Sequence, residues 1–101
     1  MIATNEVSKD FKRCKKAVHD LLTFKADEND VEEKLALADS VERKYAKALD
    51  LLTNTEKTII KYAFFYDHSF VYIAKVVGRS KDALCKTTQR IFCKIGKIMY
   101  A

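Results

Sequence analysis

The chain contains 101 residues, of which 49% are hydrophobic and 33% charged, with no proline, two glycines and a formal net charge of +5. This length fits one domain with its own core, and the composition is that of a globular protein rather than a disordered or fibrous one. Hairpins and β-sandwiches are usually punctuated by proline and glycine. Because proline is absent and only two glycines occur, we expect a single all-α domain over residues 1–101 with about five helices.

The first half of the chain predicts two long helices. Apolar residues of the first recur at spacings of four and three, which is the pattern of one helical stripe: Val7, Phe11, Cys14, Val18 and Leu21. Ser8 is placed to cap its start. A polar segment at 25–30 concentrates acids before the second helix, where a helix N-terminus favours them. The second stripe begins at Val31 and describes about six turns: Leu35, Ala38, Val41, Tyr45, Ala48 and Leu52.

These two helices are expected to pack as an antiparallel hairpin over residues 1–52. The short polar connection favours this arrangement because each apolar stripe then buries the other. The alternative is that one stripe forms the seam of a homodimer. Intrachain packing is the preferred interpretation, because the apolar faces of the second half also need cover.

A third helix is predicted to open the second half, a subregion over residues 53–101. Thr53 and Glu56 have the spacing of a capping box. An apolar face follows at Ile59, Ile60, Ala63 and Phe64. We expect the phenylalanines near the predicted helix junctions to be core side chains rather than platforms for base stacking: Phe64, Phe65 and Phe70.

Two further helices follow, joined by a Gly-x-Ser turn. After a connection at 66–68, Ser69 is a good N-cap for a short helix over 70–77. Gly78 supplies the left-handed conformation that commonly ends a helix. Ser80 can then cap the last helix, with an apolar side formed by Leu84, Ile91, Ile95 and Ile98 and with Thr87 or Thr88 filling the gap.

A short helix, a Gly-x-Ser turn and a longer helix together predict a helix-turn-helix. Ala74 must be small because the second helix crosses close by, and Ile73, Val77 and Leu84 lock the two helices at their crossing angle. The N-terminal turns of the second helix then remain free to enter a major groove.

Basic residues are concentrated in the same half of the chain. Residues 1–50 carry ten Lys/Arg against eleven acids (10 − 11 = −1), and residues 51–101 carry nine against three (9 − 3 = +6). This asymmetry indicates an acidic partner for the second half, and nucleic acid is the commonest such partner.

The segment from about Leu51 to Ile95 resembles the C-terminal promoter-binding domain of bacterial sigma factors and the small phage and prophage regulators that share its helix-turn-helix. The resemblance rests on Leu-Thr-x-x-Glu at 52–56, Ile-Ala at 73–74 and Gly-x-Ser at 78–80. It implies base and backbone contacts along the last helix at Lys81, Asp82, Cys85, Lys86, Gln89 and Arg90, with Arg79 and Ser80 at the phosphate-facing turn.

The chemistry of these positions suits DNA, with one departure. Lysine and arginine neutralise phosphates or donate to guanine, and Gln89 can both donate to and accept from adenine. Cys85 stands where the relatives usually carry a long polar or basic side chain, which weakens one base contact. Val71 and Tyr72 replace residues that are normally polar on the outer face of the first helix, and this pair is a candidate protein contact.

The sequence contains no motif for catalysis, metal binding or export. No zinc-type spacing links His19, His68 and the three cysteines, and no phosphate loop or nucleophile elbow is present. The start has no signal-peptide pattern, and the longest apolar run, 63–66, is too short to span a membrane. We therefore expect a cytoplasmic, non-enzymatic protein with no membrane association, no cofactor, no metal and reduced thiols: Cys14, Cys85 and Cys93.

The sequence thus predicts a transcriptional regulator of phage or prophage type that binds double-stranded DNA. A single helix in one groove rarely suffices, so the regulator is expected to act as a homodimer or beside RNA polymerase. The alternative is a helical adaptor or anti-regulator that binds a transcription protein through the sigma-like domain. Cys85, Val71 and Tyr72 motivate this alternative.

Overall fold

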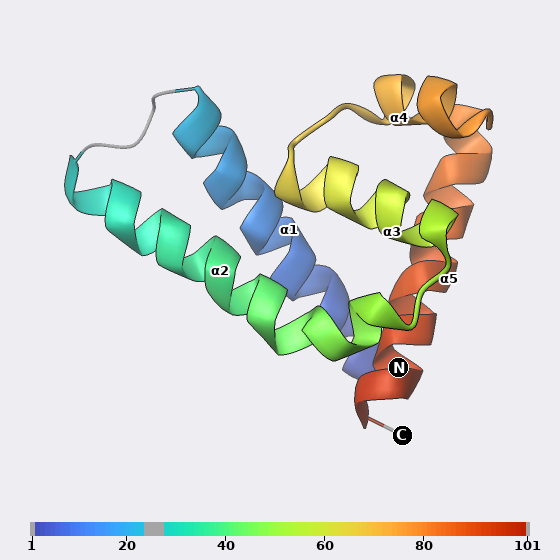
Figure 1. Ribbon diagram of the computed structural model, residues 1–101, viewed down its shortest axis with the longest axis horizontal. Helices are drawn as coiled ribbons and strands as arrows, with labels where there is room; N and C mark the ends of the chain where they lie inside the picture. Colours follow the sequence, from blue (N-terminus) through green and yellow to red (C-terminus); the bar gives the residue numbers. More distant parts are fainter. Residues whose placement is uncertain (1, 24–27, 101) are drawn as a thin grey trace.

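The computed structural model describes residues 2–23 and 28–100, and every regular element within these ranges is a helix (Figure 1). Five α-helices and one π-helical turn follow along the chain: α1 (Ile2–Leu22), α2 (Glu28–Asp50), α3 (Asn54–Ile60), η1 (Lys61–Phe65), α4 (Phe70–Val77) and α5 (Lys81–Tyr100). The predicted all-α fold of about five helices is confirmed.

The first helix begins earlier than predicted. Because α1 starts at Ile2, Ser8 lies inside it, and the prediction that Ser8 caps the helix is wrong. Val7 is fully buried, and Thr4 Oγ1 donates to Cys93 Sγ at 3.8 Å. Packing of these first turns against α5 stabilises them as helix, as tertiary contacts usually do.

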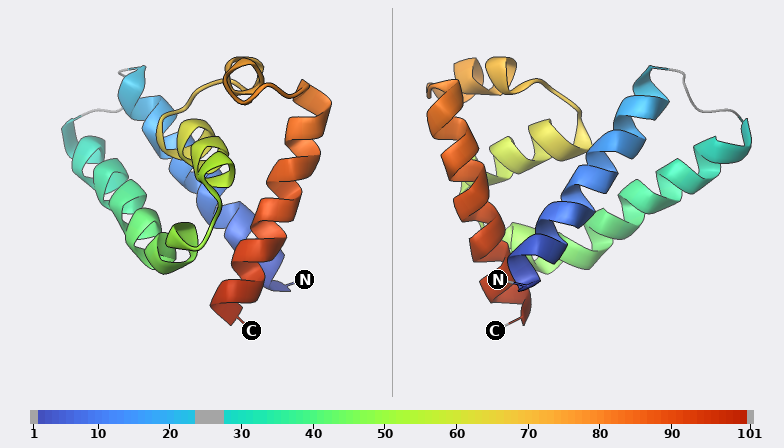
Figure 2. Two further views of the ribbon diagram at one scale, coloured as in Figure 1. Left: turned by 45° about the vertical axis from the view of Figure 1, so that its right-hand side comes forward. Right: turned by 180° about the vertical axis from the view of Figure 1, so that it is seen from behind.

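α1 and α2 form the predicted antiparallel pair, which opens toward its connecting end (Figures 1 and 2). Most of the polar segment predicted at 25–30 lies outside the described residues, and α2 begins at Glu28. Val41 and Tyr45 are buried, but Leu35 remains 55% exposed, so its predicted place on the buried stripe is wrong. At this level of α2, Leu37 and Ala38 pack against the core instead of Leu35.

One continuous core joins the hairpin to the C-terminal helices. The ring of Phe11 lies at its centre, with ring centroids 4.9 to 5.9 Å away from Tyr45, Phe64, Phe65 and Phe92. Phe64 is buried and Phe65 and Phe70 pack against the same cluster, which confirms them as core side chains. α1 is therefore a central helix that contacts α2, η1 and α5.

Candidate nucleic-acid interface

The start of α3 is fixed by its own cap and by α5. Thr53 Oγ1 accepts from the Glu56 N–H at 3.2 Å, and Glu56 Oε1 accepts from the Thr53 N–H at 2.9 Å, which confirms the capping box. The same Oε1 accepts from Lys94 Nζ at 2.8 Å. Partial burial opposes ionisation of Glu56, but these contacts outweigh it and hold its pKa below the usual value.

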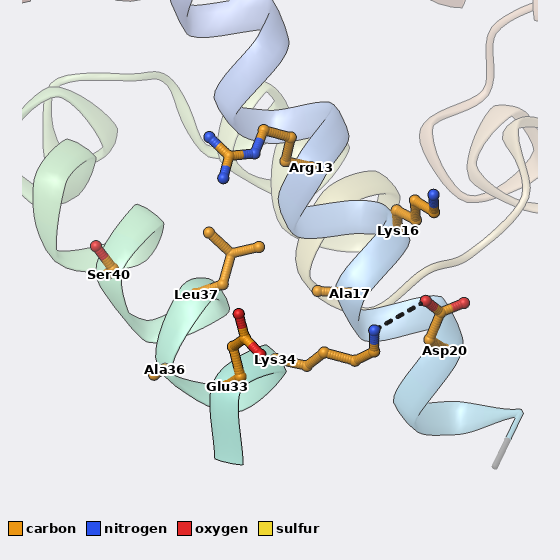
Figure 3. Close-up of a pocket in the computed structure, with 9 residues that line it drawn as sticks. All are labelled: Arg13, Lys16, Ala17, Asp20, Glu33, Lys34, Ala36, Leu37 and Ser40. Atoms are coloured by element: carbon orange, nitrogen blue, oxygen red, sulfur yellow. Dashed lines mark ion pairs between the residues drawn. The ribbon is translucent and has the colours of Figure 1, made fainter. Parts of the chain in front are cut away.

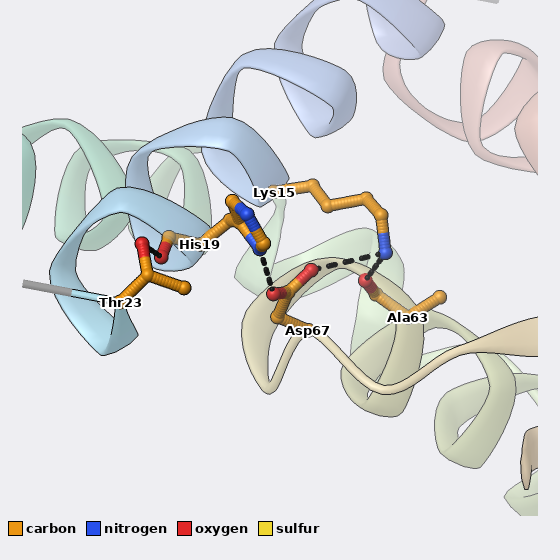
Figure 4. Close-up of polar contacts among 5 residues, drawn as sticks. All are labelled: Lys15, His19, Thr23, Ala63 and Asp67. Carbon is orange, nitrogen blue, oxygen red and sulfur yellow. Dashed lines mark hydrogen bonds and ion pairs between the residues drawn. The ribbon is translucent and has the colours of Figure 1, made fainter. Parts of the chain in front are cut away.

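A carboxylate holds the connection between η1 and α4 against α1 (Figure 4). Asp67 Oδ1 lies 3.2 Å from Lys15 Nζ, and Asp67 Oδ2 lies 2.6 Å from His19 Nδ1. Lys15 also donates to the Ala63 carbonyl at 2.9 Å. Partial burial raises the pKa of Asp67, but its hydrogen bonds to His19 and Lys15 outweigh burial and lower it overall. The connection predicted at 66–68 is thus attached to α1 by side-chain contacts.

α4 and the turn after it have the predicted caps. Ser69 Oγ accepts from the Tyr72 N–H at 3.2 Å. Gly78 adopts φ 69° and ψ 37°, in the left-handed region that side chains disfavour. The Arg79 N–H then reaches back to the Ala74 carbonyl at 2.9 Å, and Ser80 Oγ accepts from the Ala83 N–H at 3.2 Å. The chain therefore turns at 78–80 between two capped helices.

The predicted helix–helix lock is also present. Ile73 and Leu84 are fully buried, Ala74 is 8% exposed and Val77 packs on the core cluster. Thr88 fills the predicted gap on α5 and donates through Oγ1 to the Leu84 carbonyl at 2.9 Å. The crossing of α4 and α5 is thus fixed by side chains on both helices.

All eight residues assigned to the interface by resemblance lie exposed on the turn and on the first half of α5: Arg79, Ser80, Lys81, Asp82, Cys85, Lys86, Gln89 and Arg90. Within residues 2–23 and 28–100, Lys81, Lys86 and Arg90 form no ion pair. Arg79 is oriented toward α5, since its guanidinium donates to Thr87 Oγ1 at 3.1 Å. The positive charges on this face therefore remain available to an anion.

Val71 and Tyr72 are exposed too, on the outer side of α4. Val71 is 54% exposed, and Tyr72 and Val76 are each 47% exposed. The ring of Tyr72 lies 4.7 Å from that of His68, centroid to centroid. This outer apolar face is separate from the residues that lock α4 onto α5.

One feature of the site could not be inferred from the sequence: α1 borders α5 across a cleft. The cleft has a volume of about 270 Å³ and is lined by Lys12, Lys15, Phe64, Phe70, Cys85, Thr88, Gln89 and Phe92. Cys85 and Gln89 therefore face lysines that are at least 70 positions away in the chain (85 − 15 = 70). The only sequence signal was the helical spacing of the α1 lysines, which the near-neutral charge of the first half obscured.

The three cysteines differ in their surroundings. Cys14 is buried, and its burial together with the charge of Glu42 raises its pKa to about 11. Cys85 and Cys93 are exposed free thiols on α5. Among the described residues, no group of three or more His, Cys, Asp or Glu side chains is arranged to hold a metal ion.

A second hollow, of about 620 Å³, lies between α1 and α2 (Figure 3). Its walls carry both charges, and Lys34 Nζ pairs with Asp20 Oδ2 across it at 3.3 Å. This ion pair bridges the open end of the helical hairpin. The Lys34–Asp20 pair in the hollow therefore has a structural role, which is to join α1 to α2.

No family model, curated protein sequence or solved structure matches this chain. Across the described part of the chain, none of the helices combines the length and apolar character needed to cross a membrane. The geometry and charge of α4, the turn and α5 are therefore the features that indicate a function.

Proposed function

We propose that this chain is a transcriptional regulator that binds double-stranded DNA by inserting the first turns of α5 into a major groove. The observation that carries the proposal is the left-handed Gly78 between two capped helices that pack on each other, followed by an exposed basic row that forms no ion pair with any described residue. This is the arrangement by which helix-turn-helix proteins present a recognition helix.

The exposed side chains suit the separate tasks of DNA binding. Arg79 and Ser80 are suited to contact phosphates at the turn, and Lys86 and Arg90 to neutralise phosphates or donate to guanine. Gln89 can form a bidentate contact with adenine. Cys85 offers only a weak donor, so sequence discrimination depends on its neighbours.

The resemblance to sigma-factor promoter-binding domains extends the proposal to a cytoplasmic regulator of phage or prophage type. One recognition helix makes few contacts, so a homodimer or an adjacent RNA polymerase would supply the remaining affinity. The proposed activity is binding, and it requires no cofactor and no catalytic residue.

Selection of bound sequences from random duplex DNA at near-physiological salt tests this proposal. The expected result is an enriched motif whose affinity falls in the Lys86→Ala and Arg90→Ala variants, with the slope of log K against log salt reduced by about one for each lost phosphate contact. Failure to enrich any motif, together with unchanged DNA binding of both variants, would contradict it.

The exposed apolar face of α4 favours a second candidate function, which is docking onto a transcription protein. Val71, Tyr72 and Val76 are each about half exposed, and contiguous apolar patches of this kind mark protein contacts. A stoichiometric protein partner that is lost on Tyr72→Lys, in a chain that retains no duplex DNA, would favour this adaptor role over the first.

A further inference from the structure

A basic surface on α1 lies beside α5, on the same side of the molecule. Seen from behind, α1 and α5 form the two arms of a V that meet where α1 begins and α5 ends (Figure 2, right). Thr4 Oγ1 donates to Cys93 Sγ at 3.8 Å where the arms meet. Farther along, the arms enclose the cleft that carries Lys12 on one wall and Cys85 and Gln89 on the other.

Three lysines of α1 form no ion pair with any described residue. Lys9, Lys12 and Lys16 are spaced three and four residues apart, so they occupy one face of the helix, and all three are exposed. Lys12 lines the cleft to α5, and Lys16 shares a neighbouring hollow with Lys12 and also lines the hollow between α1 and α2. Lys15 differs, because Asp67 and the Ala63 carbonyl occupy its ammonium group.

The three acids of α1 form their ion pairs with α2. Glu6 and Asp10 share Lys44, at 3.2 and 2.9 Å, and Asp20 pairs with Lys34 at 3.3 Å. Asp67 lines a neighbouring hollow together with Lys12 and Lys16, and it pairs with Lys15 and His19. Asp82 is the only acid in α5. The surface that spans α1 and α5 is therefore predominantly positive, although the N-terminal half of the chain is close to neutral.

A duplex bound to α5 would bring phosphates to this surface. The major groove is about 12 Å wide, and a helix with its side chains is about 10–12 Å across, so a sugar-phosphate strand must lie directly beside a helix in the groove. We infer that Lys9, Lys12 and Lys16 contact the phosphate strand that flanks the groove occupied by α5. This inference rests on the proposed function and adds to it a second contact that does not depend on sequence.

Three double variants with the same loss of charge test the inference. Lys12→Gln/Lys16→Gln changes the α1 surface, and Lys86→Gln/Arg90→Gln changes α5. Lys47→Gln/Lys61→Gln is the matched control, because both lysines are exposed on α2 and η1 and form no ion pair with any described residue. Affinity for a mixed-sequence duplex is measured over a salt series, after circular dichroism has shown equal helix content.

We expect the α1 and α5 variants each to reduce the slope of log K against log salt by about two, and the control to leave it nearly unchanged. If only the α5 variant weakens binding and the α1 variant behaves like the control, the inference about α1 is overturned while the proposed function stands. If wild type does not retain duplex DNA at all, or the α5 variant equals the control, the proposed function falls and the inference with it.

Discussion

The two halves of α5 have different roles although they belong to one uninterrupted helix. In the C-terminal half, Phe92, Ile95 and Gly96 are buried in the core shared with α1 and α2. In the N-terminal half, only Leu84 and Thr88 are buried, and the remaining side chains are exposed or partly exposed. A helix anchored in the core at one end can therefore present exposed charged groups at the other end.

Removing an anchor from the C-terminal half should give the largest effect. Phe92 is 1% exposed, and its ring lies 5.7 Å from that of Phe11 and 5.4 Å from that of Phe64, centroid to centroid. Phe92→Ala should lower the free energy of unfolding by about 3–5 kcal/mol, because it removes buried area and leaves a cavity. Urea titration followed by circular dichroism measures this loss. A loss below about 1 kcal/mol would mean that the C-terminal half is no anchor.

Helix periodicity and capping signals predicted most of the fold because both are local properties. Ser69, Gly78 and Ser80 each act on amides or carbonyls within five residues, so the boundaries of α4 and the start of α5 were predicted correctly. The Ser8 cap was wrongly predicted because burial of Val7 outweighed a local signal. Leu35 is exposed while Leu37 and Ala38 pack against the core, so periodicity did not specify which apolar residues of α2 face the core at this level.

Only the part of the candidate site that lies on the turn and α5 could be predicted from the sequence. Exposure of the eight assigned residues follows from one helical face and one turn. Other parts of the site join residues that are far apart in the chain. Lys12 and Gln89 line one cleft, and Asp67 contacts Lys15 and His19. Such contacts depend on how the elements pack in three dimensions, so no local pattern could indicate them.

Gly78, in the turn between α4 and α5, is expected to tolerate a side chain poorly because of its backbone conformation. Gly78→Ala should lower the free energy of unfolding by about 1–2 kcal/mol, because φ is +69° there. A Cβ at this position would meet no atom within 4 Å, so steric clash adds nothing. Gly78→Asn is the matched control and should lose less, since asparagine tolerates the left-handed region. Equal thermal midpoints for glycine and alanine would contradict the assignment.

The contacts of Asp67 with Lys15 and His19 should make a smaller contribution to the free energy of unfolding, and this contribution should depend on pH. Asp67→Asn removes the charge, and asparagine suits the left-handed backbone at φ 55°. At neutral pH the substitution should lower the free energy of unfolding by about 1 kcal/mol. The lowered pKa of Asp67 means that this contribution is complete above its unfolded-state pKa and is lost as pH falls through the folded-state pKa. Thermal unfolding of both proteins from neutral to acid pH should therefore converge. A constant difference across this range would show that the carboxylate charge is not the cause.

The exposed half of α5 should show the smallest effect on stability. Lys86→Ala and Arg90→Ala remove exposed side chains without ion pairs to described residues, so each should change the free energy of unfolding by less than about 0.5 kcal/mol. Urea titration of both variants beside Phe92→Ala provides the comparison within one helix. A loss above about 1 kcal/mol would indicate that the exposed half also stabilises the core.

Alkylation of Cys85 tests most directly whether the first turns of α5 face DNA. In a Cys93→Ser variant, Cys85 is the only exposed thiol, while Cys14 is buried with a pKa raised to about 11 and serves as the slow internal reference. We predict that saturating duplex DNA slows alkylation of Cys85 several-fold and that alkylated protein no longer binds DNA. Alkylation of Cys85 at an unchanged rate in protein that is fully bound to duplex would contradict the proposed interface.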